Sequence, residues 1–163
     1  MSDSTTRRIP LTQGRFALVD AADFEMLSRF IWCVSSGYPA TNVGAGSSKR
    51  LVRMHRMLLL PDVGHEVDHI NRDPLDNRRA NLRLCSHHEN SWNMSSRGRG
   101  SSRYKGVSWS KVRSRWLVHI RVHPRLIYLG YFDSEVDAAR AYDAAAVRYR
   151  GEFARLNFPD ERA

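Results

Sequence analysis

Short apolar runs separated by polar turns characterise the first third of the chain, a pattern typical of strands rather than long helices. Residues 20–27 have the composition of a short helix that Asp20 would cap. Residues 42–48, rich in Gly and Ser, predict the tip of a hairpin. We expect strands at residues 15–19, at residues 30–34, directly after a turn at residues 37–40, and at residues 49–54. Together these elements predict a small antiparallel sheet, preceded by a loose polar segment at residues 1–7.

The last third of the chain alternates apolar and polar residues over a longer run, Arg115–Val122. An alternation of period two places successive side chains on opposite faces of a strand. One face would carry Trp116, Val118, Ile120 and Val122, and the other Arg115, Leu117, His119 and Arg121. Further strands are predicted at residues 104–109 and 125–130, and Ser134, with a carboxylate three residues later, predicts a helix that ends at Gly151. The expected module is a three-stranded antiparallel sheet with one helix on one face and a basic face left open.

Between these regions lies a polar stretch, residues 67–93, with a pattern of its own. It opens with a short apolar approach to Asp68 and His69 and continues through a loop rich in turn-forming pairs. The alternation at residues 82–84 predicts a second strand. Ser86 with a glutamate three residues later is a capping box, which predicts the start of a helix. The predicted order is strand, polar loop, strand, helix.

These patterns place the chain in the α+β class, with two modules. The first is expected over residues 1–94 and the second over residues 103–163. Residues 95–102, SSRGRGSS, have the Gly and Ser content of a flexible linker. Their arginines would equally allow this segment to lie along a phosphate backbone.

Charge indicates a class of partner. The chain has 26 Lys and Arg against 17 Asp and Glu, a formal net charge of +9. Such an excess is typical of proteins that bind a polyanion, most often nucleic acid, although a basic protein without such a partner is the alternative. With 42% hydrophobic residues, the composition is that of folded cores and not of a disordered chain.

Cysteine usage and hydropathy indicate the setting. Cys33 and Cys85 form no CxxC pair, so neither a disulfide framework nor a cysteine-rich zinc site is predicted, which fits a reducing compartment. The apolar run at residues 57–60 is ended by Pro61 and is too short to span a membrane. The N-terminal residues lack the apolar segment of a secretory signal. We therefore expect a cytoplasmic protein with no membrane partner.

The polar stretch carries the candidate chemistry. Asp68 and Asn90 both offer oxygen ligands, which suit Mg²⁺ or Mn²⁺ together with water and a phosphate oxygen. His69, beside the carboxylate, is suited to act as a general base near neutral pH. Asn81 is placed to orient the His69 ring through a hydrogen bond. A cation at the scissile phosphate and a base that activates water are the parts of phosphodiester hydrolysis, whereas a surface loop with a satisfied histidine is the alternative.

The run DHINRDPLDNRRANLRLCSHHEN, residues 68–90, resembles the HNH endonuclease family and its ββα-metal motif, which has Asp-His, then Asn, then Asn. The resemblance implies that Asp68 and Asn90 hold the metal, that His69 is the general base and that Asn81 is the central asparagine. It also implies a homing or mobile-element endonuclease that leaves 5′-phosphate ends and is encoded by a phage or a bacterium.

The same family commonly has a His-Arg pair shortly before this motif. His55 and Arg56 stand at that place, at the end of the strand predicted for residues 49–54. The resemblance therefore adds them to the candidate catalytic residues, as groups that hold the phosphate or support the site. The alternative is an ordinary contact between the sheet and the motif.

Residues 103–158 resemble the plant ethylene-response-factor (APETALA-type) DNA-binding domain through the runs YKGVSW, RWLVHIR and YLGYFDSEVDAARAYDAAAVRYRGEFARLNFP. In that family the sheet binds DNA. The resemblance and the strand pattern give as candidate DNA-binding residues Lys105, Ser108, Arg115, Trp116, His119, Arg121, Arg125 and Tyr128. Ser108, His119 and Tyr128 depart from the residues common in the plant domains, so no preference for a DNA sequence is carried over.

The sequence thus predicts a DNA endonuclease that uses one divalent metal ion, Mg²⁺ or Mn²⁺, and is targeted to double-stranded DNA by its second module. It is expected to need no small-molecule cofactor and to act as a monomer or a weak homodimer. One alternative is a transcription regulator in which the HNH module is a catalytically silent scaffold. Another is a structural zinc module.

Overall fold

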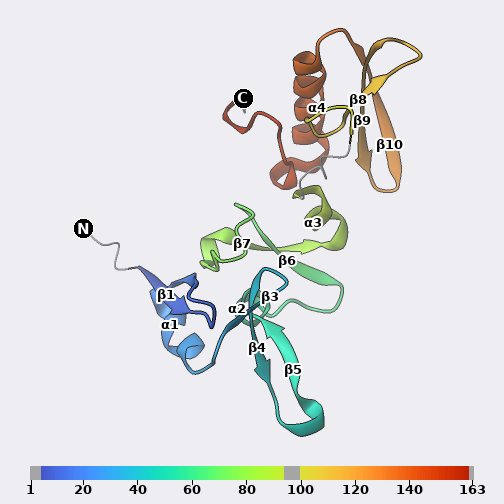
Figure 1. Cartoon of the computed structure of the whole chain (residues 1–163). Coiled ribbons are helices and arrows are strands. Elements are labelled where there is room, and N and C mark those ends of the chain that lie inside the picture. The colour runs from blue at the N-terminus through green and yellow to red at the C-terminus, as the bar shows by residue number, and fades with distance from the viewer. Residues whose placement is uncertain (1–4, 94–99, 162–163) are drawn as a thin grey trace. The chain divides into compact units, whose positions relative to one another are not determined.

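The computed structural model describes residues 5–93 and 100–161, and it shows an α+β protein built from small antiparallel sheets and helices (Figure 1). The chain divides into two compact units, Met1–His87 and His88–Ala163. No helix in the described ranges is both long enough and apolar enough to cross a membrane.

Antiparallel strand pairs form most of the first unit. The sheets pair β1 (Thr6–Pro10) with β2 (Phe16–Asp20), β4 (Tyr38–Val43) with β3 (Cys33–Ser35) and β5 (Arg50–Arg53), and β6 (His65–His69) with β7 (Leu82–Ser86). The helices are α1 (Ala21–Ser28) and α2 (Met54–Leu59), with 3-10 turns at Gly46–Ser48 and Arg79–Asn81. Trp32, 1% exposed, lies in the core of this unit, and its indole N–H donates to the carbonyl oxygen of Leu27 at 2.8 Å.

Three details of this unit differ from the sequence-based expectation. The segment expected to be loose up to residue 7 becomes β1 from Thr6 onward, because it pairs with β2. The predicted strand end at His55 and Arg56 is wrong, since both residues lie in α2. Asp20 occupies the N-cap position of α1, but its carboxylate accepts a hydrogen bond from the Arg79 backbone N–H at 2.7 Å instead of capping the helix.

The polar loop between β6 and β7 is fixed against the first sheet. The Leu18 N–H donates to the Leu75 carbonyl oxygen, and the Asn77 N–H donates to the Leu18 carbonyl oxygen, both at 2.8 Å. The Arg79 guanidinium donates two hydrogen bonds of 2.8 Å to the buried Asp23 carboxylate on α1. These contacts join segments more than fifty residues apart and hold the loop in one conformation.

The end of the polar stretch follows the predicted order. β6 and β7 pair in a register that sets Asp68 opposite Arg83. α3 (His87–Asn93) begins directly after Ser86, where the capping box predicts a helix start. The order strand, loop, strand, helix is therefore confirmed.

The second unit is a three-stranded antiparallel sheet with one long helix alongside it (Figure 1). Its elements are β8 (Val107–Ser110), β9 (Arg115–Val122), β10 (Arg125–Phe132) and α4 (Glu135–Arg150), followed by 3-10 turns at Gly151–Phe153 and Pro159–Glu161. Ser134 caps α4 by accepting from the Asp137 N–H at 3.3 Å, and Gly151 ends it. The predicted sheet and helix are confirmed, and the alanines of α4 let it pack closely on Val118 and Ile120.

Residues 94–99, which contain most of the predicted linker, lie outside the described residues. Ser101 and Ser102 belong to the second unit by their hydrogen bonds. The Trp109 N–H donates to the Ser101 hydroxyl at 2.6 Å, and the Ser102 hydroxyl donates to Glu135 at 2.7 Å. The second unit therefore includes the last residues of the predicted linker.

Candidate functional site

Three rings from distant segments meet in the first unit and define the candidate active site. The His69 ring at the end of β6 lies 5.0 Å, centroid to centroid, from the His55 ring on α2, with the two planes at 89°. The Tyr38 ring at the start of β4 lies 5.2 Å from His55 and 6.0 Å from His69. The structure thus brings together two of the residues that the sequence singles out, and adds Tyr38. We call these three rings the ring cluster.

Burial sets the charge state of the ring cluster. His55 is 3% exposed and His69 is 5% exposed. Burial, followed by the charges of His69, Arg53 and Arg56, lowers the pKa of His55 to about 3. Burial also lowers the pKa of His69, although the Asn77 side chain and three nearby carboxylates act in the opposite direction. Both rings are therefore neutral at pH 7, and a neutral imidazole is the form that accepts a proton.

The His55 pKa predicts a pH-dependent stability of the first unit. Between about pH 6.5 and pH 3 the unfolded chain binds a proton on His55 that the folded chain does not bind, so the free energy of unfolding falls as the pH falls. The loss is about 1.4 kcal/mol per pH unit in this window, or about 3 kcal/mol at pH 4.5. Urea unfolding of the wild-type chain and of the His55→Gln variant measures it. The difference in free energy of unfolding between the variant and the wild type should be constant above pH 7 and should shift in favour of the variant below pH 6.5. A difference that stays constant at all pH values would contradict the assignment.

Asp68, the candidate metal ligand on β6, is engaged by an arginine. The Arg83 guanidinium donates from Nε at 2.9 Å and from Nη2 at 2.7 Å to Asp68 Oδ2. The carboxylate is 6% exposed and the arginine side chain 12% exposed, so the pair is shielded from water. The pair follows from the β6–β7 register, because residues directly opposite each other in an antiparallel pair point to the same face.

Asn81, the candidate central asparagine, braces the loop and does not hydrogen-bond the His69 ring. Its side-chain oxygen accepts from the Asn71 N–H at 2.9 Å, and its amide donates to Asn71 Oδ1 at 2.9 Å and to the Asp76 carbonyl oxygen at 2.8 Å. The expected direct bond to His69 is therefore replaced by contacts that fix the chain immediately after it. The Asn77 side chain, which is 0% exposed, acts on the His69 ring and favours a higher pKa of that ring.

The remaining candidates of the first module differ in setting. Arg56 lies on α2 next to His55, with its side chain exposed. Asn90 lies in α3 and is half-buried. The oxygen ligands of Asp68 and Asn90 are of the kind that a hard divalent cation takes, although the Arg83 guanidinium already compensates the Asp68 charge. In residues 5–93 and 100–161, no group of three or more His, Cys, Asp or Glu side chains is arranged to hold a metal ion.

The second unit presents one open sheet face, which we call the open face. Cross-strand register places on this face Ser108, Arg115, Leu117, His119, Arg121, Leu126, Tyr128 and Tyr131. A bulge between Tyr128 and Gly130 changes the alternation, so the rings of Tyr128 and Tyr131 lie on the same face, 5.7 Å apart. Arg121 and Tyr128 are exposed, whereas Arg115 donates two hydrogen bonds of 2.7 Å to Asp133. Most of the candidate DNA-binding residues are therefore grouped on one surface.

Three candidate DNA-binding residues lie elsewhere. Trp116 packs against the core of the second unit and meets Trp109 edge to face at 4.9 Å, because it shares the face of Val118. Arg125 is paired with Val122 in the register and belongs to that same face. Lys105 precedes β8, and its ammonium donates to the Trp92 carbonyl oxygen. The structure does not group these three with the open face.

Sequence reasoning missed Tyr38, Asn77 and Arg83 as partners of the candidate site. The register of the predicted hairpin points to Arg83, since the two strands were expected and Asp68 lies opposite it. For Tyr38 and Asn77 the local pattern offers no signal, because each reaches His69 only through tertiary packing.

Comparison with known proteins identifies two domain families. The HNH endonuclease model matches residues 60–92, and the AP2 domain model matches residues 102–152. APETALA2-like protein 2 of Oryza sativa subsp. indica is 48% identical over 62 residues, which are 37% of this chain and 14% of that protein. The AP2-like ethylene-responsive transcription factor TOE2 of Arabidopsis thaliana is 48% identical over 58 residues, 36% of this chain and 12% of that protein. This chain thus spans only a small part of its plant relatives.

Protein 3.8 of Escherichia phage T7 is 47% identical over 53 residues, 32% of this chain and 44% of that protein. Phage and plant proteins are therefore both among the relatives. The chain thus combines a segment that matches the HNH endonuclease family with a segment that matches the AP2 domain family.

Proposed function

We propose that this protein is a metal-dependent DNA endonuclease of the homing or mobile-element type, acting inside a cell, whose AP2 unit binds double-stranded DNA. The observation that carries the proposal is the ring cluster. A buried, neutral His69 follows directly on the Asp68 carboxylate, within the segment that matches the HNH model. Hydrolysis of a phosphodiester requires a base that activates water and a carboxylate that can hold a metal ion, and the two are neighbours here.

His69 is proposed as the general base. Its neutral imidazole takes a proton from the water that attacks the phosphorus, and the leaving 3′-oxygen departs, which produces a 5′-phosphate. The perpendicular packing of His55 and the approach of Asn77 fix the plane of the His69 ring. The exposed Arg56 guanidinium is proposed to attract the phosphate, and Asn81 to hold the loop that follows the base.

Asp68 and Asn90 are proposed as the metal ligands that the resemblance implies. A bound Mg²⁺ or Mn²⁺ would supply charge neutralisation at the scissile phosphate. Arg83 donates two hydrogen bonds to Oδ2 of Asp68 and orients that carboxylate. The Asp68–Arg83 pair thereby fixes the position of one candidate ligand.

The AP2 unit is proposed to hold duplex DNA against its open face. Arg121 and Tyr128 are exposed there beside His119, and a three-stranded sheet is a known shape for reading the major groove. Arginine contacts with phosphate and guanine would supply the affinity, and the nuclease unit the cut.

The test is incubation of a supercoiled plasmid with the purified chain and Mg²⁺ or Mn²⁺. We expect conversion to nicked circles, because one active site per chain cuts one strand at a time, and complete loss of conversion in excess EDTA. Equal conversion with and without EDTA would reject the metal requirement.

A transcription regulator with a silent HNH domain is the second candidate. The observation that favours it is the Asp68–Arg83 ion pair, since a carboxylate already neutralised by a guanidinium has less charge to offer a cation. In the same experiment a regulator would retard DNA in a gel at every metal concentration and leave the plasmid supercoiled.

A further inference from the structure

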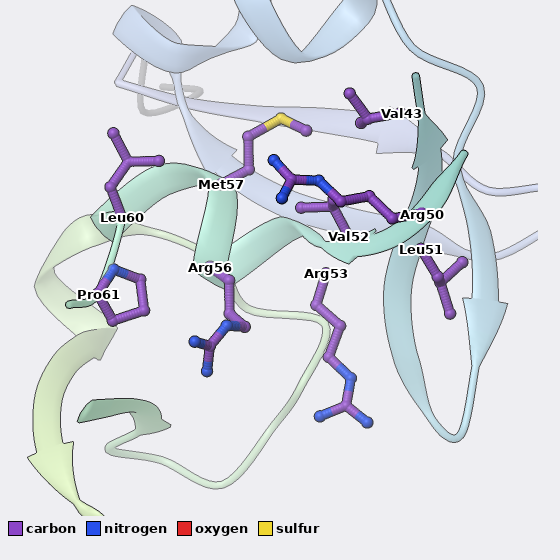
Figure 2. Close-up of a pocket in the computed structure, with 9 residues that line it drawn as sticks. All are labelled: Val43, Arg50, Leu51, Val52, Arg53, Arg56, Met57, Leu60 and Pro61. Atoms are coloured by element: carbon purple, nitrogen blue, oxygen red, sulfur yellow. The ribbon is translucent and has the colours of Figure 1, made fainter. Parts of the chain in front are cut away.

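An open pocket on the first unit has the shape and charge of a groove that could bind a nucleic-acid strand. It has a volume of about 700 Å³ and lies between the end of β5 and α2. Arg50, Arg53 and Arg56 line it at intervals of three residues, two from the strand and one from the helix. We call it the β5–α2 groove. Figure 2 shows the Arg53 and Arg56 guanidinium groups extending to the same side, while Arg50 reaches across toward Met57.

The positive charge of this groove is not compensated. No acidic residue lines it. In the part of the chain that the structure describes, its three arginines form no ion pair, whereas Arg79 and Arg83 of the same unit each bind a carboxylate. All three are exposed. Arginines that stabilise the fold are thus paired with carboxylates, and those of the groove are left available to an anion from outside.

The walls of the groove are apolar, and one wall residue, Leu60, has a strained backbone conformation. Leu51 is 52% exposed and Leu60 is 78% exposed, although both side chains are large and apolar. Leu60 ends α2 with φ 44° and ψ 58°, a left-handed conformation that L side chains seldom adopt. This turn sets Leu60 and Pro61 at the rim of the groove. Apolar walls beside arginines suit a ligand that alternates anionic groups with apolar ones, as a nucleic-acid strand alternates phosphates with sugars and bases.

One arginine of the groove contacts the ring cluster. The Arg53 guanidinium carbon lies 4.7 Å from the centre of the Tyr38 ring, and that ring lies 6.0 Å from the His69 ring. The HNH match begins at residue 60, at the rim of the groove. An anion bound by Arg53 would therefore be separated from the proposed base by the Tyr38 ring.

We propose that the β5–α2 groove binds the backbone of the DNA strand that leads to His69, with phosphates at Arg50, Arg53 and Arg56 and sugars against Leu51 and Leu60. This inference rests on the proposed function, because it assigns the strand's approach to the same active site. It gives the nuclease unit a DNA contact of its own, separate from the AP2 open face. An acidic peptide could pair with the same arginines, but its carboxylates would gain nothing from contact with the apolar rim.

The test measures DNA binding without cleavage. The full chain is titrated with a fluorescently labelled duplex in EDTA at several salt concentrations, for the wild type and for the triple variant Arg50→Gln, Arg53→Gln, Arg56→Gln. The slope of log K against log salt is negative, and each lost phosphate contact reduces its magnitude by about 0.9. The magnitude of the slope should therefore decrease by about 2 to 3 in the triple variant, and the affinity should fall at least tenfold. The control is Arg7→Gln, Arg8→Gln, Arg15→Gln, which removes the same charge on and beside β1; equal losses in the two variants would overturn the proposal.

Leu60→Gly keeps the test valid if the triple variant does not fold. Glycine accepts the left-handed conformation, so thermal unfolding should occur at or above the wild-type temperature, while the affinity for DNA falls several-fold. An unchanged affinity would overturn the role of the rim, and a polyglutamate peptide that competes as well as DNA would reject DNA as the occupant. If the triple variant shows a shallower salt dependence but the wild-type chain never nicks a plasmid, the groove proposal is supported and the nuclease proposal is refuted. If the wild-type chain nicks the plasmid but the triple variant keeps the wild-type salt dependence, the nuclease proposal is supported and the groove proposal is refuted.

Discussion

Replacing His69 by alanine is expected to lower the rate of plasmid nicking by about 10²- to 10⁴-fold, the usual contribution of a positioned general base. The imidazole is buried against His55 and Tyr38, and its neutral form is favoured at pH 7. DNA binding should be nearly unchanged, because the ring is 5% exposed and contributes no charge. Single-turnover nicking and a gel-shift titration of the same preparation separate the two effects. Wild-type nicking by His69→Ala would remove His69 from the mechanism.

The pH profile gives a second readout of the same residue. Because the pKa of His69 is lowered, the acid limb of the nicking rate should lie below pH 6.5, with no loss of rate between pH 8 and pH 7. The Asn77 side chain favours the protonated ring, so Asn77→Ala should move this limb to still lower pH. Asn77→Ala is the matched control for His69→Ala, because it changes the surroundings of the His69 ring but leaves the imidazole itself in place. A limb that moves to higher pH would contradict the assigned interaction.

Sequence reasoning succeeded where the pattern was long and periodic. The strand Arg115–Val122 was predicted with its bounds, since eight alternating residues fit a strand and not a helix. The start of α4 followed from Ser134, because an N-cap is a local interaction between residues three apart. In both cases the deciding contacts lie within a few residues of each other.

The same reasoning failed for short elements and for tertiary contacts. α2 has six residues, fewer than two helical turns, so Met54–Leu59 shows no full amphipathic period, and its first residues, up to His55 and Arg56, are predicted from the sequence as the end of a strand. β1 exists because β2 pairs with it, which composition does not reveal. In the candidate site, adjacency identified Asp68 and His69, but the rings that surround His69 come from segments 14 and 31 residues away.

Buried polar groups explain why those contacts were not foreseeable. His55 and Asn77 are almost fully buried, although their residue types are commonly found at surfaces. Only the fold decides which polar residues are enclosed and which neighbours they meet. The arginines of the β5–α2 groove illustrate the opposite case, since the sequence shows their spacing but not that they face one pocket.

The second large expected effect is in the AP2 unit, where changing Gly106 to alanine should lower the free energy of unfolding by about 2–5 kcal/mol. Gly106 has φ +80°, and a Cβ built there would lie 1.9 Å from Cδ2 and 2.2 Å from Cε2 of Tyr142. Tyr142 is 2% exposed and accepts a hydrogen bond from Arg150 at 2.8 Å, so its ring has no free space to move into. The estimate adds overpacking of about 1–3 kcal/mol to left-handed strain of about 1–2 kcal/mol.

Gly130→Ala is the matched control, because Gly130 also has a positive φ, +130°, but its nearest atom beyond the adjoining residues would lie 3.5 Å from the added Cβ. Urea unfolding of the full chain should show a smaller loss for Gly130→Ala than for Gly106→Ala. The double variant Gly106→Ala, Tyr142→Leu should lose less than the sum of its single changes, because the smaller side chain removes the clash. Additive losses in this cycle, or equal losses at the two glycines, would show that strain alone acts at Gly106 and that the close approach of Gly106 to the Tyr142 ring of α4 is not what requires glycine there.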